Sequence, residues 1–193
     1  MERIYQALPL RELGSDAGFR RPTQPSSERV TLESPAVQVM TDFTRATPAT
    51  IRPQAPLAGA NQLMITRGVR LLLVVDEHEI VLGVLTANDL LGERSMLAAT
   101  GRGVRRDELT VADVMTSAER VEVVEFVQVQ GARVGHVLET LRRAGRQHAL
   151  VVERAMVRGI FSISQIARQL GVSVPAGGEV ALTFSEIEAA LVK

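Results

Sequence analysis

Thr86 and Asp89 are the residues of this chain whose types and spacing best suit the binding of a small polar molecule. They stand where an apolar segment over residues 80–86, expected to be a strand, gives way to an expected helix that opens at Asn88. A helix N-terminus exposes unpaired backbone N–H groups and a partial positive charge, which suit a phosphate. A carboxylate three residues after the threonine can accept hydrogen bonds from both hydroxyls of a ribose.

The same spacing has a second interpretation that requires no ligand. A Ser or Thr followed three residues later by an acid or an amide is a capping box, which satisfies free N–H groups at a helix start. Thr86 with Asp89 fits this pattern, and Ser162 with Gln165 fits it equally well. The residues alone therefore leave both a helix cap and a ligand site open for Thr86 and Asp89.

Two copies of one pattern of elements position these segments. The first copy has an expected short strand over 49–52, a helix around 57–64, strands over 70–76 and 80–86, and the closing helix from Asn88. The second has an expected long alternating strand over 121–130, a helix around 134–141, strands over 148–153 and 156–162, and a closing helix that stops at Gly171. Each unit is too small to bury both faces of its sheet, so we expect the two to pack together.

Three sequence blocks match between the two copies. They are VMT at 39–41 and 114–116, LVVD at 73–76 with LVVE at 150–153, and GVLT at 83–86 with GIFS at 159–162. Repetition of this kind is the signature of a tandem architecture.

The repeated order β-α-β-β-α resembles the CBS domain, which is named for cystathionine β-synthase. The blocks that carry the resemblance are DVMT at 113–116, LVVD at 73–76 and, above all, GVLTANDL at 83–90. The resemblance implies a mixed α+β or α/β fold in which two tandem repeats pack as a pseudo-two-fold pair. It also implies an adenosine ligand (AMP, ADP, ATP or S-adenosylmethionine) in clefts between the repeats.

The resemblance further implies roles for individual residues. In CBS-type sites the acid of the last block binds the ribose, which is the role expected of Asp89, with Thr86 near the ribose or phosphate. Such a cleft takes its base pocket from the other repeat, so we expect Asp89 to face Gln130, Gln147 and His148.

A second cleft is expected to be weaker. It would combine residues of the two repeats, namely Ser162 and Gln165 with Thr50, Ile51 and Arg70. Gln165 stands where an aspartate is expected, and a neutral amide accepts a hydrogen bond less strongly than a carboxylate does.

The domain boundaries follow from the repeat. We predict a mobile N-terminal tail over 1–35, the first repeat over 36–98, a linker over 99–110 and the second repeat over 111–172. Residues 173–193 form a C-terminal extension that contains an expected helix, with Thr183 and Glu186 as its capping box.

Composition argues against several classes of function. Lys+Arg and Asp+Glu are both 22 and aromatic residues are 3% of the chain, which disfavours binding to nucleic acid. The chain has no cysteine, and its three histidines share no metal-ligand spacing, so no metal site is expected. No catalytic constellation or cofactor fingerprint is recognisable, so we do not expect an enzyme. No apolar run approaches the roughly 18–20 residues that span a bilayer, so we expect no membrane contact and a cytoplasmic location.

The sequence therefore predicts a regulatory module that senses an adenosine nucleotide or S-adenosylmethionine and signals to an unidentified target protein. The alternative is a ligand-free scaffold for dimerisation or interaction. In either case the apolar faces left over on helices such as 90–97 predict a homodimer.

Overall fold

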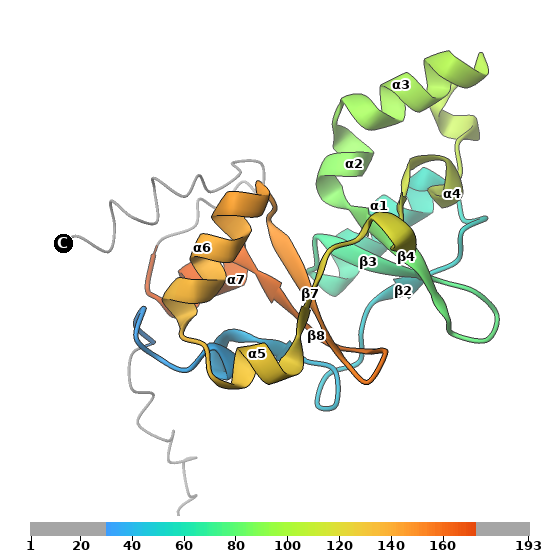
Figure 1. Cartoon of the computed structure of the whole chain (residues 1–193). Helices are drawn as coiled ribbons and strands as arrows, with labels where there is room; N and C mark the ends of the chain where they lie inside the picture. The colour runs from blue at the N-terminus through green and yellow to red at the C-terminus, as the bar shows by residue number, and fades with distance from the viewer. Residues whose placement is uncertain (1–29, 173–193) are drawn as a thin grey trace, which may run out of the picture.

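The computed structural model describes residues 30–172, which form two four-stranded sheets and their covering helices (Figure 1). The elements of the first half are η1 (Ala36–Val39), β1 (Thr41–Asp42), β2 (Thr50–Ile51), α1 (Leu57–Arg67), β3 (Leu71–Val75), β4 (Val81–Thr86), α2 (Ala87–Leu91), α3 (Glu93–Arg102) and η2 (Arg106–Glu108). Those of the second half are α4 (Val111–Val114), β5 (Thr116–Ser117), η3 (Ala118–Arg120), β6 (Val123–Glu125), α5 (Phe126–Gln130), α6 (Val134–Ala144), β7 (His148–Glu153), β8 (Met156–Ser162) and α7 (Ile163–Gln169). The tandem mixed α/β fold expected from the repeat is confirmed.

The two sheets have the same arrangement of strands. The first has the order β2-β3-β4-β5 and the second β6-β7-β8-β1. In each sheet the first pair of strands is parallel and the other two pairs are antiparallel. This equivalence is the structural counterpart of the matched sequence blocks.

Each sheet ends in a short strand contributed by the other half of the chain. β1 lies near the start of the first repeat but pairs with β8, and β5 lies near the start of the second repeat but pairs with β4. The exchanged strands pass close to the glycine of each GVLT or GIFS block: a Cβ added at Gly83 would lie 2.2 Å from the Thr116 carbonyl oxygen, and one at Gly159 would lie 2.6 Å from that of Thr41. The shared glycine of the two blocks is therefore required by the exchange.

The core consists of three apolar clusters. One packs against the sheet of each half and also includes residues from the other half, 36–40 in the second-half cluster and 111–115 in the first-half cluster. The third joins the two sheets through Leu73, Val75, Val84 and Leu150. The all-apolar strand β3 supplies both faces of its sheet: Leu72 and Val74 pack in the first-half cluster, whereas its other residues pack between the sheets. Both faces of β3 are therefore covered, which explains its unbroken apolar run.

The prediction of one long strand over residues 121–130 is wrong. Only Val123–Glu125 is a strand, and Phe126–Gln130 is the short helix α5. Phe126 and Val129, three residues apart on one helical face, pack in the second-half cluster, while Val127 is exposed. The alternation of apolar and polar residues in this segment was compatible with either structure.

The ends of the described region bear on the expected boundaries, which stay predictions. Residues 30–35 are hydrogen-bonded to the start of α6, through Leu32 and Ser34 to the amides of Gly135 and Val134. In the stretch expected to link the repeats, α3 continues to Arg102. The expected C-terminal helix with its Thr183 capping box lies outside the described residues, as do residues 1–29.

Candidate functional site: a cleft between the two sheets

A cleft of about 510 Å³ lies between the two halves of the molecule. This volume falls within the range of small-molecule pockets, roughly 300–1,000 Å³. One side is formed by the end of β4 with the starts of α2 and α3, and the other by residues 144–148, which lead into β7. Leu71, Val84, Val121 and Leu150, all members of the apolar cluster between the sheets, also line it. The cleft therefore combines an apolar lining with polar edges.

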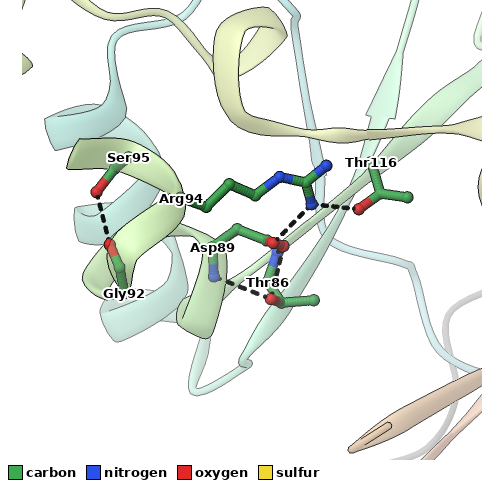
Figure 2. A network of polar contacts seen from close by, with 6 residues as sticks. All are labelled: Thr86, Asp89, Gly92, Arg94, Ser95 and Thr116. Atoms are coloured by element: carbon green, nitrogen blue, oxygen red, sulfur yellow. Dashed lines mark hydrogen bonds and ion pairs between the residues drawn. The ribbon is translucent and has the colours of Figure 1, made fainter. Parts of the chain in front are cut away.

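Thr86 and Asp89 form a complete capping box on the wall of this cleft (Figure 2). Asp89 Oδ2 accepts hydrogen bonds from the Thr86 amide at 2.9 Å and from the Thr86 hydroxyl at 2.7 Å. The Asp89 amide donates to Thr86 Oγ1 at 3.2 Å. The cap expected as the ligand-free interpretation therefore exists, and it leaves Oδ1 as the carboxylate oxygen that faces other partners.

Arg94 contacts that second oxygen. Its Nη1 lies 2.9 Å from Asp89 Oδ1 and 2.7 Å from Oγ1 of Thr116, which belongs to the exchanged strand β5 (Figure 2). The arginine thus joins the start of α2, the start of α3 and a segment of the second repeat at one point. The Asp89 side chain is only 15% exposed and that of Arg94 is 42% exposed, so this ion pair is reached by solvent from the arginine side.

Buried Ser95 holds Arg94 in this position. Its hydroxyl lies 3.0 Å from the Leu90 carbonyl oxygen and 3.1 Å from that of Gly92 (the latter contact is drawn in Figure 2), and it is 1% exposed. These contacts close the bend between α2 and α3. The first turn of α3, and with it Arg94, is thereby directed toward the cleft.

Asp113 reproduces the local environment of Asp89 at a place outside the cleft lining. Its Oδ2 accepts from the Thr110 amide at 2.8 Å and from the Thr110 hydroxyl at 2.9 Å, and its Oδ1 pairs with Arg102. Both aspartates are 15% exposed. Hydrogen bonds from Thr110, chiefly its backbone amide, lower the pKa of Asp113. Asp113 is therefore a matched control for the structural part of the Asp89 side chain.

The opposite side of the cleft carries two of the expected residues, Gln147 and His148. Burial lowers the pKa of His148 to about 4, and the nearby positive charge of Arg70 acts in the same direction. The imidazole is therefore neutral at pH 7 and offers one donor and one acceptor nitrogen. Thr86, Asp89, Gln147 and His148 thus line one cleft, which is where the resemblance to the CBS domain put them, and their role in ligand binding stays a prediction.

Gln130 is not among the residues that line the cleft, so its expected place there is wrong. It is exposed at the C-terminal end of α5, because the segment after Glu125 turns into a helix instead of continuing as a strand. In Figure 1 α5 lies at the end of the second half that is remote from α2 and α3.

The residues of the expected second cleft are arranged differently from their counterparts. Gln165 Oε1 accepts from the Thr41 hydroxyl at 2.9 Å, so the amide reaches the exchanged strand β1 directly, without an intervening arginine. Ser162 contacts Ser164 at 3.0 Å and makes no cap hydrogen bond at α7, so the expected Ser162–Gln165 capping box does not form. Thr50 and Ile51 form β2 beside β3, and Arg70 directly precedes β3. A weaker ligand site at these residues stays a prediction.

Six further polar residues of the cleft were not predicted as site residues from the sequence: Asn88, Arg94, Thr116, Arg120, Glu122 and Arg146. Thr116 belongs to a matched block, so its repetition was an available signal. Arg94 follows a bend between two helices and carried no periodic signal. Within residues 30–172, no cluster of three or more His, Cys, Asp or Glu side chains is suited to a metal ion. None of the helices in this part of the chain is both long and apolar enough to cross a membrane.

Comparison with known proteins agrees with this architecture. The model of the CBS domain family matches residues 38–95. No protein of curated function matches the chain. Among solved structures, an uncharacterized conserved protein from Pyrococcus horikoshii is 20% identical with a TM-score of 0.57, and the match covers 77% of this chain and 100% of that one.

Two further structures were determined with ligands. The CBS-domain pair of protein MJ0100, in complex with 5′-methylthioadenosine and S-adenosyl-L-methionine, is 21% identical with a TM-score of 0.51, over 74% of this chain and 97% of that one. CBSX2 in complex with AMP is 19% identical with a TM-score of 0.52, over 70% of this chain and 94% of that one. Residues 38–95 thus match the CBS domain in sequence, and the two repeats together have the fold of the CBS-domain pairs.

Proposed function

We propose that this protein is a regulatory module that binds an adenosine nucleotide, or S-adenosylmethionine, in the cleft between its repeats and signals to a target protein in the cytoplasm. The observation that carries the proposal is the position of Asp89: a carboxylate on the wall of a 510 Å³ cleft that also has an apolar lining. The apolar residues suit a base, and carboxylate oxygens suit ribose hydroxyls. The ligands named for two similarly folded pairs, MJ0100 and CBSX2, are adenosine compounds.

The second candidate function is a ligand-free scaffold. The specific observation in its favour is that Asp89 is fully engaged without a ligand, by Thr86 at Oδ2 and by Arg94 at Oδ1. For the proposed function, a ribose has to share or replace the contact of Arg94 with Asp89.

Isothermal titration with AMP, ADP, ATP and S-adenosylmethionine tests the proposal in wild type, Asp89→Ala and Asp113→Ala. Because both aspartates cap a helix in the same way, each variant should lose about 1 kcal/mol of unfolding free energy. Only Asp89→Ala should lose binding. Equal binding by the two variants would remove Asp89 from the site, and no binding of any of the four compounds to wild type would favour the scaffold.

A homodimer is part of the proposal. Leu91, Met96 and Leu97 on α2 and α3 are between 58% and 69% exposed, which leaves an apolar surface that a second copy could cover.

A further inference from the structure

The polar residues of the cleft have an excess of positive charge. Three arginines line it (Arg94, Arg120 and Arg146), against two carboxylates, Asp89 and Glu122. The whole chain has a formal net charge of zero, so this excess is local. His148 adds no charge at pH 7, because burial lowers its pKa to about 4.

The three arginines differ in how far the protein already satisfies them. Arg94 is paired with Asp89 at 2.9 Å. Arg146 lies 3.3 Å from Glu122, but these side chains are 42% and 78% exposed, so the pair contributes little in water. Arg120 has no hydrogen bond or ion pair with another residue of the described part of the chain, and it is exposed where η3 leads toward β6. At least one guanidinium at the edge of the cleft is thus available to a ligand.

The possible adenosine ligands differ in the charge they would bring to these arginines. Adenosine is uncharged, and S-adenosylmethionine has a net positive charge, because its sulfonium and ammonium groups outweigh its single carboxylate; a cleft with an excess of positive charge therefore disfavours it relative to an anion. A phosphate is an anion, and the guanidinium group binds it through two parallel hydrogen bonds. The charge of the cleft therefore distinguishes between ligands that share the same base and ribose.

We propose that the cleft selects a phosphorylated nucleoside over adenosine and over S-adenosylmethionine, with Arg120 as the arginine that binds the phosphate. This inference rests on the proposed function, since it names the ligand class of the same site. Arg94 and Arg146 add positive charge near the bound phosphate, and their ion pairs with Asp89 and Glu122 hold them at the cleft. The phosphate thus lies at the edge of the cleft where solvent enters, while the base lies on the apolar lining.

Isothermal titration with AMP, ATP, adenosine, S-adenosylmethionine and sodium phosphate tests this inference, in wild type, Arg120→Gln and Arg154→Gln. Arg154 is a matched control, because it is an exposed arginine in the β7–β8 turn, at the far end of β7 from His148. We expect AMP and ATP to bind at least about tenfold more tightly than adenosine, and phosphate alone not to bind measurably. Arg120→Gln should remove most of this preference and leave the affinity for adenosine unchanged, whereas Arg154→Gln should change neither.

Two results would overturn the inference, and they are distinguishable. If adenosine or S-adenosylmethionine binds as tightly as AMP and ATP, or if Arg120→Gln keeps the full preference for phosphate, the proposed function stands and the selection is refuted. If none of the compounds binds, the proposed function and the inference fail together.

Discussion

Replacing Gly83 with alanine should strongly destabilise the protein, because the exchange of strands between the repeats leaves no room for a side chain there. The added Cβ would lie 2.2 Å from the Thr116 carbonyl oxygen and 3.1 Å from Ser117 Cα. Both are backbone atoms of β5, so no side-chain rotation can relieve the contact. Relief requires β5 to move away from β4, which would disturb the two pairings Gly83↔Ser117 and Val84↔Thr116.

The expected magnitude follows from the cost of overpacking. Inserting extra carbon atoms into a packed site typically costs about 1–3 kcal/mol, and an immovable backbone neighbour puts this site at the upper end. For a chain of this size, about 3 kcal/mol corresponds to a fall in melting temperature of roughly 6–12 °C. Gly101 is the matched control: it lies in α3 with no atom within 4 Å of an added Cβ, so Gly101→Ala should be neutral or stabilising by up to about 1 kcal/mol.

Thermal and urea unfolding followed by circular dichroism measure both variants. Gly83→Ala should also weaken nucleotide binding, because Thr116 moves with β5 and loses its contact with Arg94. If Gly83→Ala unfolds at the same temperature and urea concentration as Gly101→Ala, the close approach of β5 to β4 is refuted, and with it the explanation of the shared glycine.

Three further predictions concern the cleft, the contact between the sheets and the assembly. Burial lowers the pKa of His148 to about 4 from 6.5, so the unfolded chain binds a proton below pH 6.5 that the folded chain takes up only near pH 4. The free energy of unfolding should therefore fall as the pH is lowered from 6.5 to 4, by up to about 1.4 kcal/mol per pH unit. Urea unfolding at pH 7 and pH 5 should show a smaller fall for His148→Gln than for wild type. Leu150→Ala, at a 4% exposed position in the cluster between the sheets, should cost about 2–5 kcal/mol in urea unfolding, and a loss under about 1 kcal/mol would contradict the packing of the two sheets. Leu97→Glu should shift a homodimer to monomer in sedimentation velocity, whereas a wild type that is already monomeric would exclude the proposed assembly surface.

The repeat made most of the fold predictable from the sequence, because its elements are long enough to show a period. The strands β7 and β8 have the expected bounds, β3 is one residue shorter than expected at each end, and β4 is one residue shorter at its start. The exchange of β1 and β5 was beyond such reasoning, since strands of two residues have no period and their pairing depends on tertiary structure. The prediction of a single strand over residues 121–130 was wrong for a related reason, because a five-residue helix and a five-residue alternating strand can have the same apolar pattern.

The candidate site was predictable only where it coincided with a motif. Thr86 and Asp89 were found from their spacing at the end of a strand, and Gln147 and His148 from the resemblance to the CBS domain. Arg94 was not, because its position depends on the bend between α2 and α3 that Ser95 closes. Arg120 and Arg146 reach the cleft from segments outside the predicted site, and charged residues in such segments look like ordinary surface residues in a sequence.

Hydrogen–deuterium exchange of the full chain, with and without saturating ATP, tests most directly whether a nucleotide binds in the cleft between the repeats. We expect slower exchange in two separate segments, the end of β4 with α2 at residues 84–91 and the approach to β7 at residues 144–150, since both line the cleft. The same two segments should show no change in Asp89→Ala. Protection confined to one repeat, protection elsewhere in the chain, or none at all despite measurable ATP binding would contradict a ligand site between the repeats.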